Sequence, residues 1–193
     1  AVKTAGLIPL FDTPVRNSGG YTVHITNYSA SYTWTITTSA GSISVSSPSG
    51  SVETITITSL SGGTSATVTA STTRTNYSSE TSTVTAAALK ALTIQASSPS
   101  FYSGNSVTET YTASALLVGD TITSMTFTFI GTGSTSYGPN TTMPTAVGTY
   151  RATPSAAVFG VGSASNYLIT YIYGDITITV DPAFSGGSII ITV

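Results

Sequence analysis

The stretch Gly20-Tyr-Thr-Val-His-Ile-Thr26 decides the fold class. Successive side chains of a β-strand point to opposite faces, so Tyr21, Val23 and Ile25 share one face and polar side chains share the other. The alternation resumes over residues 28–36, which we expect to form a second strand. One apolar and one polar face is typical of an antiparallel sheet that covers a core on one side.

Short apolar alternations continue along the first half of the chain, separated by residues that favour turns. They lie at residues 43–45, 55–57, 66–70 and 81–85, with Ser-Pro-Ser-Gly at 47–50 and Ser-Gly-Gly at 61–63. Short strands divided by such turns are typical of a β-sandwich. The run Ala86-Ala-Ala-Leu89 is too short for a stable helix, and we expect a linker there.

The second half repeats this organisation. We expect strands at 92–96, 107–113, 122–130 and 147–152, and a hairpin formed by 166–173 and 176–180 around Gly174 and Asp175. Within 122–130, the side chains of Met125, Phe127 and Phe129 share one face, which should be buried. The sequence therefore predicts an all-β protein of two tandem immunoglobulin-like β-sandwiches, residues 1–88 and 89–182.

Residues 183–193 form a Gly-rich spacer followed by an apolar terminal strand. The predicted strand consists of Ser188, Ile189, Ile190, Ile191, Thr192 and Val193. Left unpaired, such a strand would be prone to aggregate. It either pairs within its own domain, opens a further module, or adds to a sheet of another molecule, where main-chain hydrogen bonds supply affinity.

The composition argues against an enzyme. Ser and Thr make up more than a third of the chain, which has no Cys, one His and 6% charged residues. Acid, base and nucleophilic catalysis draw mainly on the residues that are scarce here, and we expect no cofactor and no metal site. The net charge of −2 disfavours nucleic acid as a partner. No apolar run reaches the roughly 20 residues that cross a bilayer.

Residues from about 89 to 182 resemble the MBG domain, an immunoglobulin-like repeat of bacterial surface proteins. The resemblance is carried by Leu92-Thr-Ile-Gln-Ala-Ser-Ser-Pro, Tyr102-Ser-Gly-Asn, Leu117-Val-Gly-Asp, Val147-Gly-Thr-Tyr and Ser165-Asn-Tyr-Leu-Ile-Thr-Tyr-Ile-Tyr-Gly-Asp-Ile-Thr-Ile-Thr-Val. Residues from about 8 to 88 are similar to fibronectin type III-like or immunoglobulin-like repeats, through Gly20-Tyr-Thr-Val, Thr26-Asn-Tyr-Ser-Ala-Ser-Tyr-Thr-Trp and Arg74-Thr-Asn-Tyr-Ser. The resemblance implies a structural or adhesive module with no catalytic residues.

Three functions stay open for such a chain. The first is a structural module of an extracellular surface protein or filament, whose partners are copies of itself or neighbouring repeats. The second is an adhesin or carbohydrate-binding module that recognises surface glycans through its loops. The third is a passive spacer repeat in a giant surface protein. Because the chain begins with Ala1 and not Met, both a mature form and an excerpt of a longer protein fit the sequence.

Aromatic residues are the main candidates for core anchors. These are Trp34, Tyr32, Phe127, Phe129 and Tyr171. Trp34 with Tyr28 and Tyr32 could form a platform for a sugar ring, but their parity with Ile36 favours a core position, as for the buried Trp of immunoglobulin-like sandwiches. His24 shares a strand face with Thr residues, which favours a solvated side chain over a metal ligand.

Two kinds of covalent modification are also considered. The Asn-x-Ser/Thr triplets at Asn27, Asn76 and Asn140 are possible glycosylation sites. Lys3 or Lys90 could form a crosslink to an Asn with Glu109 as the buried acid. An odd acid on an apolar face is more often found at a strand end, which is the favoured interpretation of Glu109.

Overall fold

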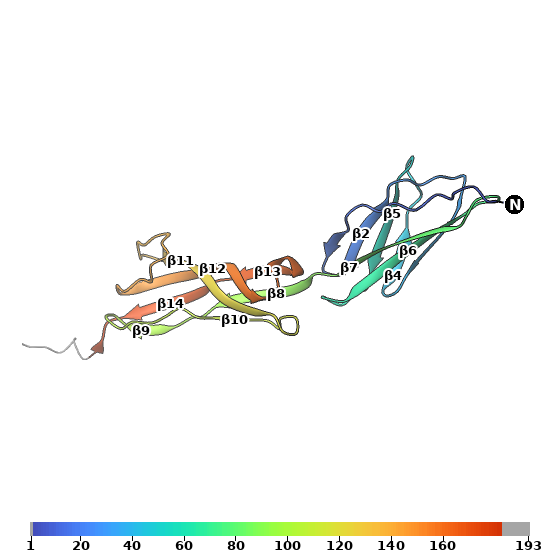
Figure 1. The fold of residues 1–193 in the computed structure, drawn as a ribbon. Helices are drawn as coiled ribbons and strands as arrows, with labels where there is room; N and C mark the ends of the chain where they lie inside the picture. The colour runs from blue at the N-terminus through green and yellow to red at the C-terminus, as the bar shows by residue number, and fades with distance from the viewer. Residues whose placement is uncertain (1, 183–193) are drawn as a thin grey trace, which may run out of the picture. The chain divides into compact units, whose positions relative to one another are not determined.

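The computed structural model describes residues 2–182, and the predicted strand Ser188–Val193 lies outside them (Figure 1). The chain divides into two compact units. The first contains residues 1–91 with 165–168, and the second contains residues 92–164 and the chain from Ile169 onward. The described residues form strands and one 3-10 turn, Ala164–Asn166, with no α-helix among them. The prediction of an all-β protein with immunoglobulin-like sandwiches is confirmed.

The first unit contains two antiparallel sheets (Figure 1). One has the order β1-β2-β5-β4, formed by Val15–Asn17, Gly20–Ile25, Glu53–Thr58 and Ser42–Val45. The other has the order β3-β6-β7, formed by Thr33–Thr38, Ser65–Thr73 and Glu80–Ala87. The strand positions predicted after residue 40 agree with β4, β5, β6 and β7.

The core of the first unit lies between these sheets. Tyr21, Val23 and Ile25 of β2 are each 0% exposed, as their shared parity predicts. They pack in one cluster with Ile55 and Ile57 of β5 and with apolar residues of β6. The Tyr21 hydroxyl donates to the Ala66 main-chain oxygen (2.9 Å). The core therefore combines apolar packing with a buried hydrogen bond from one sheet to the other.

The strand expected over residues 28–36 begins only at Thr33. Residues before it form a loop, because their main-chain groups bond to other loop residues and not along a strand. The Tyr28 N–H donates to Ser51 O (2.8 Å), and the Tyr32 N–H donates to Ser29 O (3.2 Å). Alternating polar and apolar residues therefore occur here in a loop, and the loop residue Tyr28 still packs against the core of the sandwich.

The prediction of a linker at residues 86–89 was wrong for most of that run. β7 extends to Ala87, and Ala88 is 0% exposed within the core cluster. Small side chains fit this end of the first unit, where Ala88 N–H donates to Thr64 O (3.0 Å). Alanine side chains that suggested a linker therefore pack in or against the core of the first unit.

The second unit also contains two sheets (Figure 1). One has the order β10-β8-β13, formed by Tyr111–Ala113, Lys90–Ala96 and Tyr167–Ile172, although the first two residues of β8 and of β13 are grouped with the first unit above. The other has the order β11-β12-β14-β9, formed by Thr121–Thr132, Gly148–Val161, Gly174–Thr179 and Ser100–Tyr102. β14 pairs with β9 in parallel, and the other pairs of this sheet are antiparallel.

The hairpin predicted around Gly174 is absent from the described structure. β13 and β14 lie in different sheets and are separated by Tyr173 alone. One residue cannot form the two-residue turn that a tight hairpin needs. The chain instead crosses from one layer of the sandwich to the other at this point. Gly174 permits the crossing, since a Cβ there would collide with the Ser97 and Ala96 main-chain oxygens.

Candidate binding clefts

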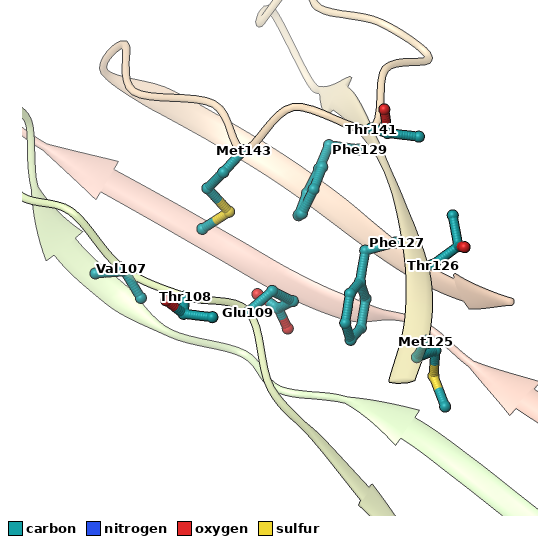
Figure 2. Close-up of a pocket in the computed structure, with 9 residues that line it drawn as sticks. All are labelled: Val107, Thr108, Glu109, Met125, Thr126, Phe127, Phe129, Thr141 and Met143. Carbon is teal, nitrogen blue, oxygen red and sulfur yellow. The ribbon is translucent and has the colours of Figure 1, made fainter. Parts of the chain in front are cut away.

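A cleft of about 580 Å³ opens in the second unit between β11 and the loop before β10 (Figure 2). We call it the Glu109 cleft; it is lined by Val107, Thr108, Glu109, Met125, Thr126, Phe127, Phe129, Thr141 and Met143. Figure 2 shows the Glu109 carboxyl beside the ring of Phe127, while Phe129 and Met143 lie near each other further along the cleft. The Phe127 and Phe129 rings stack, with centroids 6.4 Å apart.

The apolar face of β11 is only partly buried. Phe129 is 3% exposed and belongs to the core, whereas Met125 and Phe127 are half-buried and line the cleft. The residues that lie across from them, Val107–Glu109, belong to no strand. The sandwich is therefore incompletely closed here, and the prediction that the whole face is buried holds for Phe129 alone.

Glu109 brings a carboxyl group into this apolar cleft. Its Oε1 accepts a hydrogen bond from Ser97 Oγ (2.7 Å), while its buried Oε2 has no partner among the described residues. Burial raises the pKa of Glu109, and the bonds from Ser97 offset this only in part. The folded unit therefore holds a proton on Glu109 more tightly than the unfolded chain does.

We expect the Glu109→Gln variant to be more stable than the wild type above neutral pH. A carboxyl whose folded pKa is raised adds full stability below its ordinary value of 4.5, and this stability is lost as the pH rises through the folded pKa. Gln cannot ionise, so the variant escapes that loss. Thermal unfolding at pH 4 and pH 8 checks this: the two proteins should be similar at pH 4 and diverge at pH 8.

The exposed Asp175 provides the control for that measurement, because Asp175→Asn removes a carboxyl that is not buried. Its melting temperature should stay close to that of the wild type at both pH values, because the exposed ion pair that it loses with Arg151 (3.4 Å) contributes little. An equal loss of stability in Glu109→Gln at pH 4 and pH 8 would contradict the linkage and indicate a role for Glu109 in packing alone.

One edge of β11 runs along the Glu109 cleft. On the side away from β12, Phe129 exchanges main-chain hydrogen bonds with Asn140 (2.7 and 3.0 Å). Alternate residues direct their main-chain groups to the same side, so Phe127 presents its N–H and C=O to this edge. Within residues 2–182 they have no partner there. The edge of β11 is therefore open beside an apolar cleft.

A smaller cleft of about 360 Å³ lies in the first unit. We call it the aromatic cleft; it is lined by Tyr28, Tyr32, Trp34, Ile36, Val45 and Glu53. The rings of Tyr28 and Trp34 stack, with centroids 5.4 Å apart at 22°. Trp34 Nε1 donates to Ser29 O (3.0 Å). Trp34 is thus half-buried, in contact with the core on one side and with the cleft on the other.

Glu53 is a charged residue at the inner end of the aromatic cleft. It is 8% exposed and points inward with Ile55 and Ile57 of β5. Burial raises the pKa of Glu53, and its buried Oε2 accepts no hydrogen bond from the described residues. We did not select Glu53 from the sequence. Its parity with the two isoleucines was the signal that would have revealed it.

The remaining predicted anchors lie in varied surroundings. Tyr32 packs edge-on against Tyr77, with centroids 5.7 Å apart, and Arg74 lies over both rings. Tyr171 is half-buried, and its hydroxyl accepts a hydrogen bond from the Ala157 N–H (3.0 Å). These two tyrosines therefore make specific ring and hydroxyl contacts, whereas Phe129 fills the core of its unit.

His24 forms a local pair with Asp12. The ring Nδ1 of His24 lies 2.6 Å from Asp12 Oδ2, and the main-chain N–H of His24 donates to Asp12 Oδ1 (2.7 Å). Burial raises the pKa of Asp12, but the hydrogen bonds and charge of His24 outweigh this and the pKa is lowered. In the described part of the chain, no three His, Asp or Glu residues come together as metal ligands. No helix found there has the length and apolarity to cross a membrane.

The three glycosylation candidates differ in the availability of their side chains. The Asn27 amide nitrogen, which would carry the glycan, donates to Ile8 O (2.8 Å). Asn76 and Asn140 are exposed. The amide nitrogen of Asn27 is therefore already engaged in a hydrogen bond, whereas Asn76 and Asn140 are exposed.

The geometry gives no support to a crosslink between Lys90 and an Asn with Glu109 as its buried acid. Lys90 is the first residue of β8, and Glu109 bonds Ser97, which follows the last residue of that strand. At a rise of about 3.3 Å per residue, the two ends of this stretch are roughly 20 Å apart. Glu109 itself lies in the loop just before β10 and not within a strand.

No family model and no curated protein matches this chain. Among solved structures, it is similar to the N-terminal eight Ig domains of Down Syndrome Cell Adhesion Molecule, at 13% identity and a TM-score of 0.48, covering 90% of this chain and 25% of that one. It is also similar to an I-band fragment of titin, at 13% identity and a TM-score of 0.40, covering 86% and 62%. Tandem Ig repeats of Dlar match at 12% identity and a TM-score of 0.30, covering 90% and 98%.

Proposed function

We propose that this chain is a structural module of an extracellular surface protein or filament, coupled to a copy of itself or to a neighbouring repeat by strand addition. The strand that adds is Ser188–Val193, and its docking site is the open edge of β11. The observation that carries the proposal is this edge, where the main-chain groups of Phe127 are unpaired in the described residues beside a cleft of apolar side chains.

The chemistry of the two partners is complementary. An added strand obtains affinity from main-chain hydrogen bonds and specificity from alternate side chains that enter pockets. The segment supplies three consecutive isoleucines, and the cleft supplies Phe127 and Met143. With only 6% charged residues, neighbouring modules meet little electrostatic repulsion. An enzymatic role is not part of this proposal.

We expect the full chain to form concentration-dependent assemblies that a chain ending at Pro182 does not form. Loss of the isoleucine segment removes both the main-chain pairing and the apolar side chains that drive it. Sedimentation velocity and negative-stain microscopy of the two proteins check this. Assemblies should appear as linear ladders or filaments, since head-to-tail contacts propagate when they do not close.

A pair of full-length variants separates strand addition from a general effect of charge. Replacement of Ile189, Ile190 and Ile191 by Lys should abolish assembly, whereas replacement of Ser185, Gly186 and Gly187 by Lys adds the same charge and should preserve it. Met125→Lys, placed on the β11 edge, should weaken assembly as well. Monomers of the unmodified chain at every concentration would overturn the proposal and favour the passive spacer or a glycan-binding adhesin.

A further inference from the structure

The aromatic cleft of the first unit contains a carboxyl group with no counter-charge. Glu53 is more than nine-tenths buried, and no ion pair reaches it from the described residues. A buried charge without a partner is costly. Glu53 also faces a cleft and not a sealed core, so a molecule from solution can supply what the protein does not.

The walls of this cleft favour a cation. Three of its six lining residues are aromatic, and the faces of such rings attract cations through their quadrupoles. One wall residue already contacts a cation: the Arg74 guanidinium carbon lies 5.4 Å from the centroid of Tyr32, and 4.6 Å from that of Tyr77, which is not among the lining residues. Arg74 forms no ion pair with Glu53 in the described residues.

The same geometry is less suited to a sugar. A sugar ring needs an open aromatic face and several directional hydrogen bonds. Tyr28 and Trp34 cover one face of each other by stacking, and the Trp34 indole N–H is already bonded to Ser29 O. What the cleft offers is the Glu53 carboxyl, whose Oε2 has no partner among the described residues, with aromatic side chains around it.

We propose that the aromatic cleft is a binding site for an organic ammonium group, either a quaternary ammonium or a primary alkylammonium, with Glu53 as its counter-ion and Tyr28, Tyr32 and Trp34 as its walls. The ammonium neutralises the buried carboxylate, and its alkyl substituents fill the apolar part of the cleft. The site is separate from the strand-addition proposal, which concerns the second unit.

Trp34 is the only tryptophan of the chain, so its fluorescence reports on this cleft directly. We expect choline chloride or n-butylammonium chloride to shift the Trp34 emission in a saturable manner, while NaCl at equal ionic strength does not. Glu53→Gln should weaken the binding of either cation by at least ~10-fold, because it keeps the side-chain shape and removes the charge. Asp175→Asn loses one carboxylate elsewhere and should bind as the wild type does.

A second variant keeps the test decisive if Glu53→Gln does not fold. Tyr32→Leu leaves Glu53 in place and removes one aromatic wall, and it should also weaken binding. The proposal is overturned if NaCl reproduces the shift, or if neither variant changes the affinity. It is equally overturned if D-glucose or D-galactose produces a saturable shift that both ammonium salts fail to produce.

Discussion

Tyr21→Ala should lower the free energy of unfolding of the first unit by about 3–5 kcal/mol, the usual cost of removing a large aromatic side chain from a core. Tyr21 is 0% exposed and packs with Val23, Ile55 and other members of the core cluster. The truncation therefore leaves a cavity between the two sheets. Urea unfolding followed by Trp34 fluorescence checks this, since Trp34 packs against the same cluster.

Tyr21→Phe is the matched control, because it retains the ring and removes only the hydroxyl. That hydroxyl donates to Ala66 O, so the variant should lose about 1–3 kcal/mol, the cost of a buried acceptor left without its donor. Equal losses in the two variants would show that the hydrogen bond, and not the packing of the ring, stabilises this part of the sandwich.

The sequence predicted most reliably those strands whose parity is enforced by burial. A shift of Tyr21, Val23 and Ile25 by one residue would turn all three side chains into solvent, so their pattern has a single solution. Residues 28–36 show the same alternation without that constraint. There the main-chain bonds of Tyr28 and Tyr32 to loop residues determine the structure, and periodicity alone does not reveal such bonds.

Crossings between sheets were harder to predict than strands. Residues 166–180 have the composition of a hairpin, but β13 and β14 belong to opposite layers because only Tyr173 separates them. The Glu109 cleft was not predicted, since it depends on where a strand fails to form and a sandwich edge stays open. The aromatic cleft brings together Tyr28, Tyr32 and Trp34, which the sequence had grouped as a platform while favouring a core position for them. Each cleft contains a glutamate that has the same parity along the chain as apolar neighbours. An acid at such a position can therefore indicate a cleft.

Gly174→Ala should destabilise the second unit by about 2–3 kcal/mol, although it adds a single methyl group. The Cβ at this position would collide with the main-chain oxygen of Ser97 and approach that of Ala96. Main-chain atoms cannot rotate away as a flexible side chain can, so the end of β8 and the start of β14 must separate. Calorimetry of the variant checks this through the unfolding transition of the second unit.

Gly104→Ala serves as the control within the same unit. Its Cβ would meet no atom within 4 Å, and only the positive φ of 91° opposes the substitution. That strain costs about 1 kcal/mol, so the control should lose clearly less stability than Gly174→Ala. Because Ser97 also donates to Glu109, displacement of Ser97 in Gly174→Ala should weaken that bond and raise the pKa of Glu109 further. A loss in Gly174→Ala no larger than that in Gly104→Ala would show that β14 can move away from β8 at little cost.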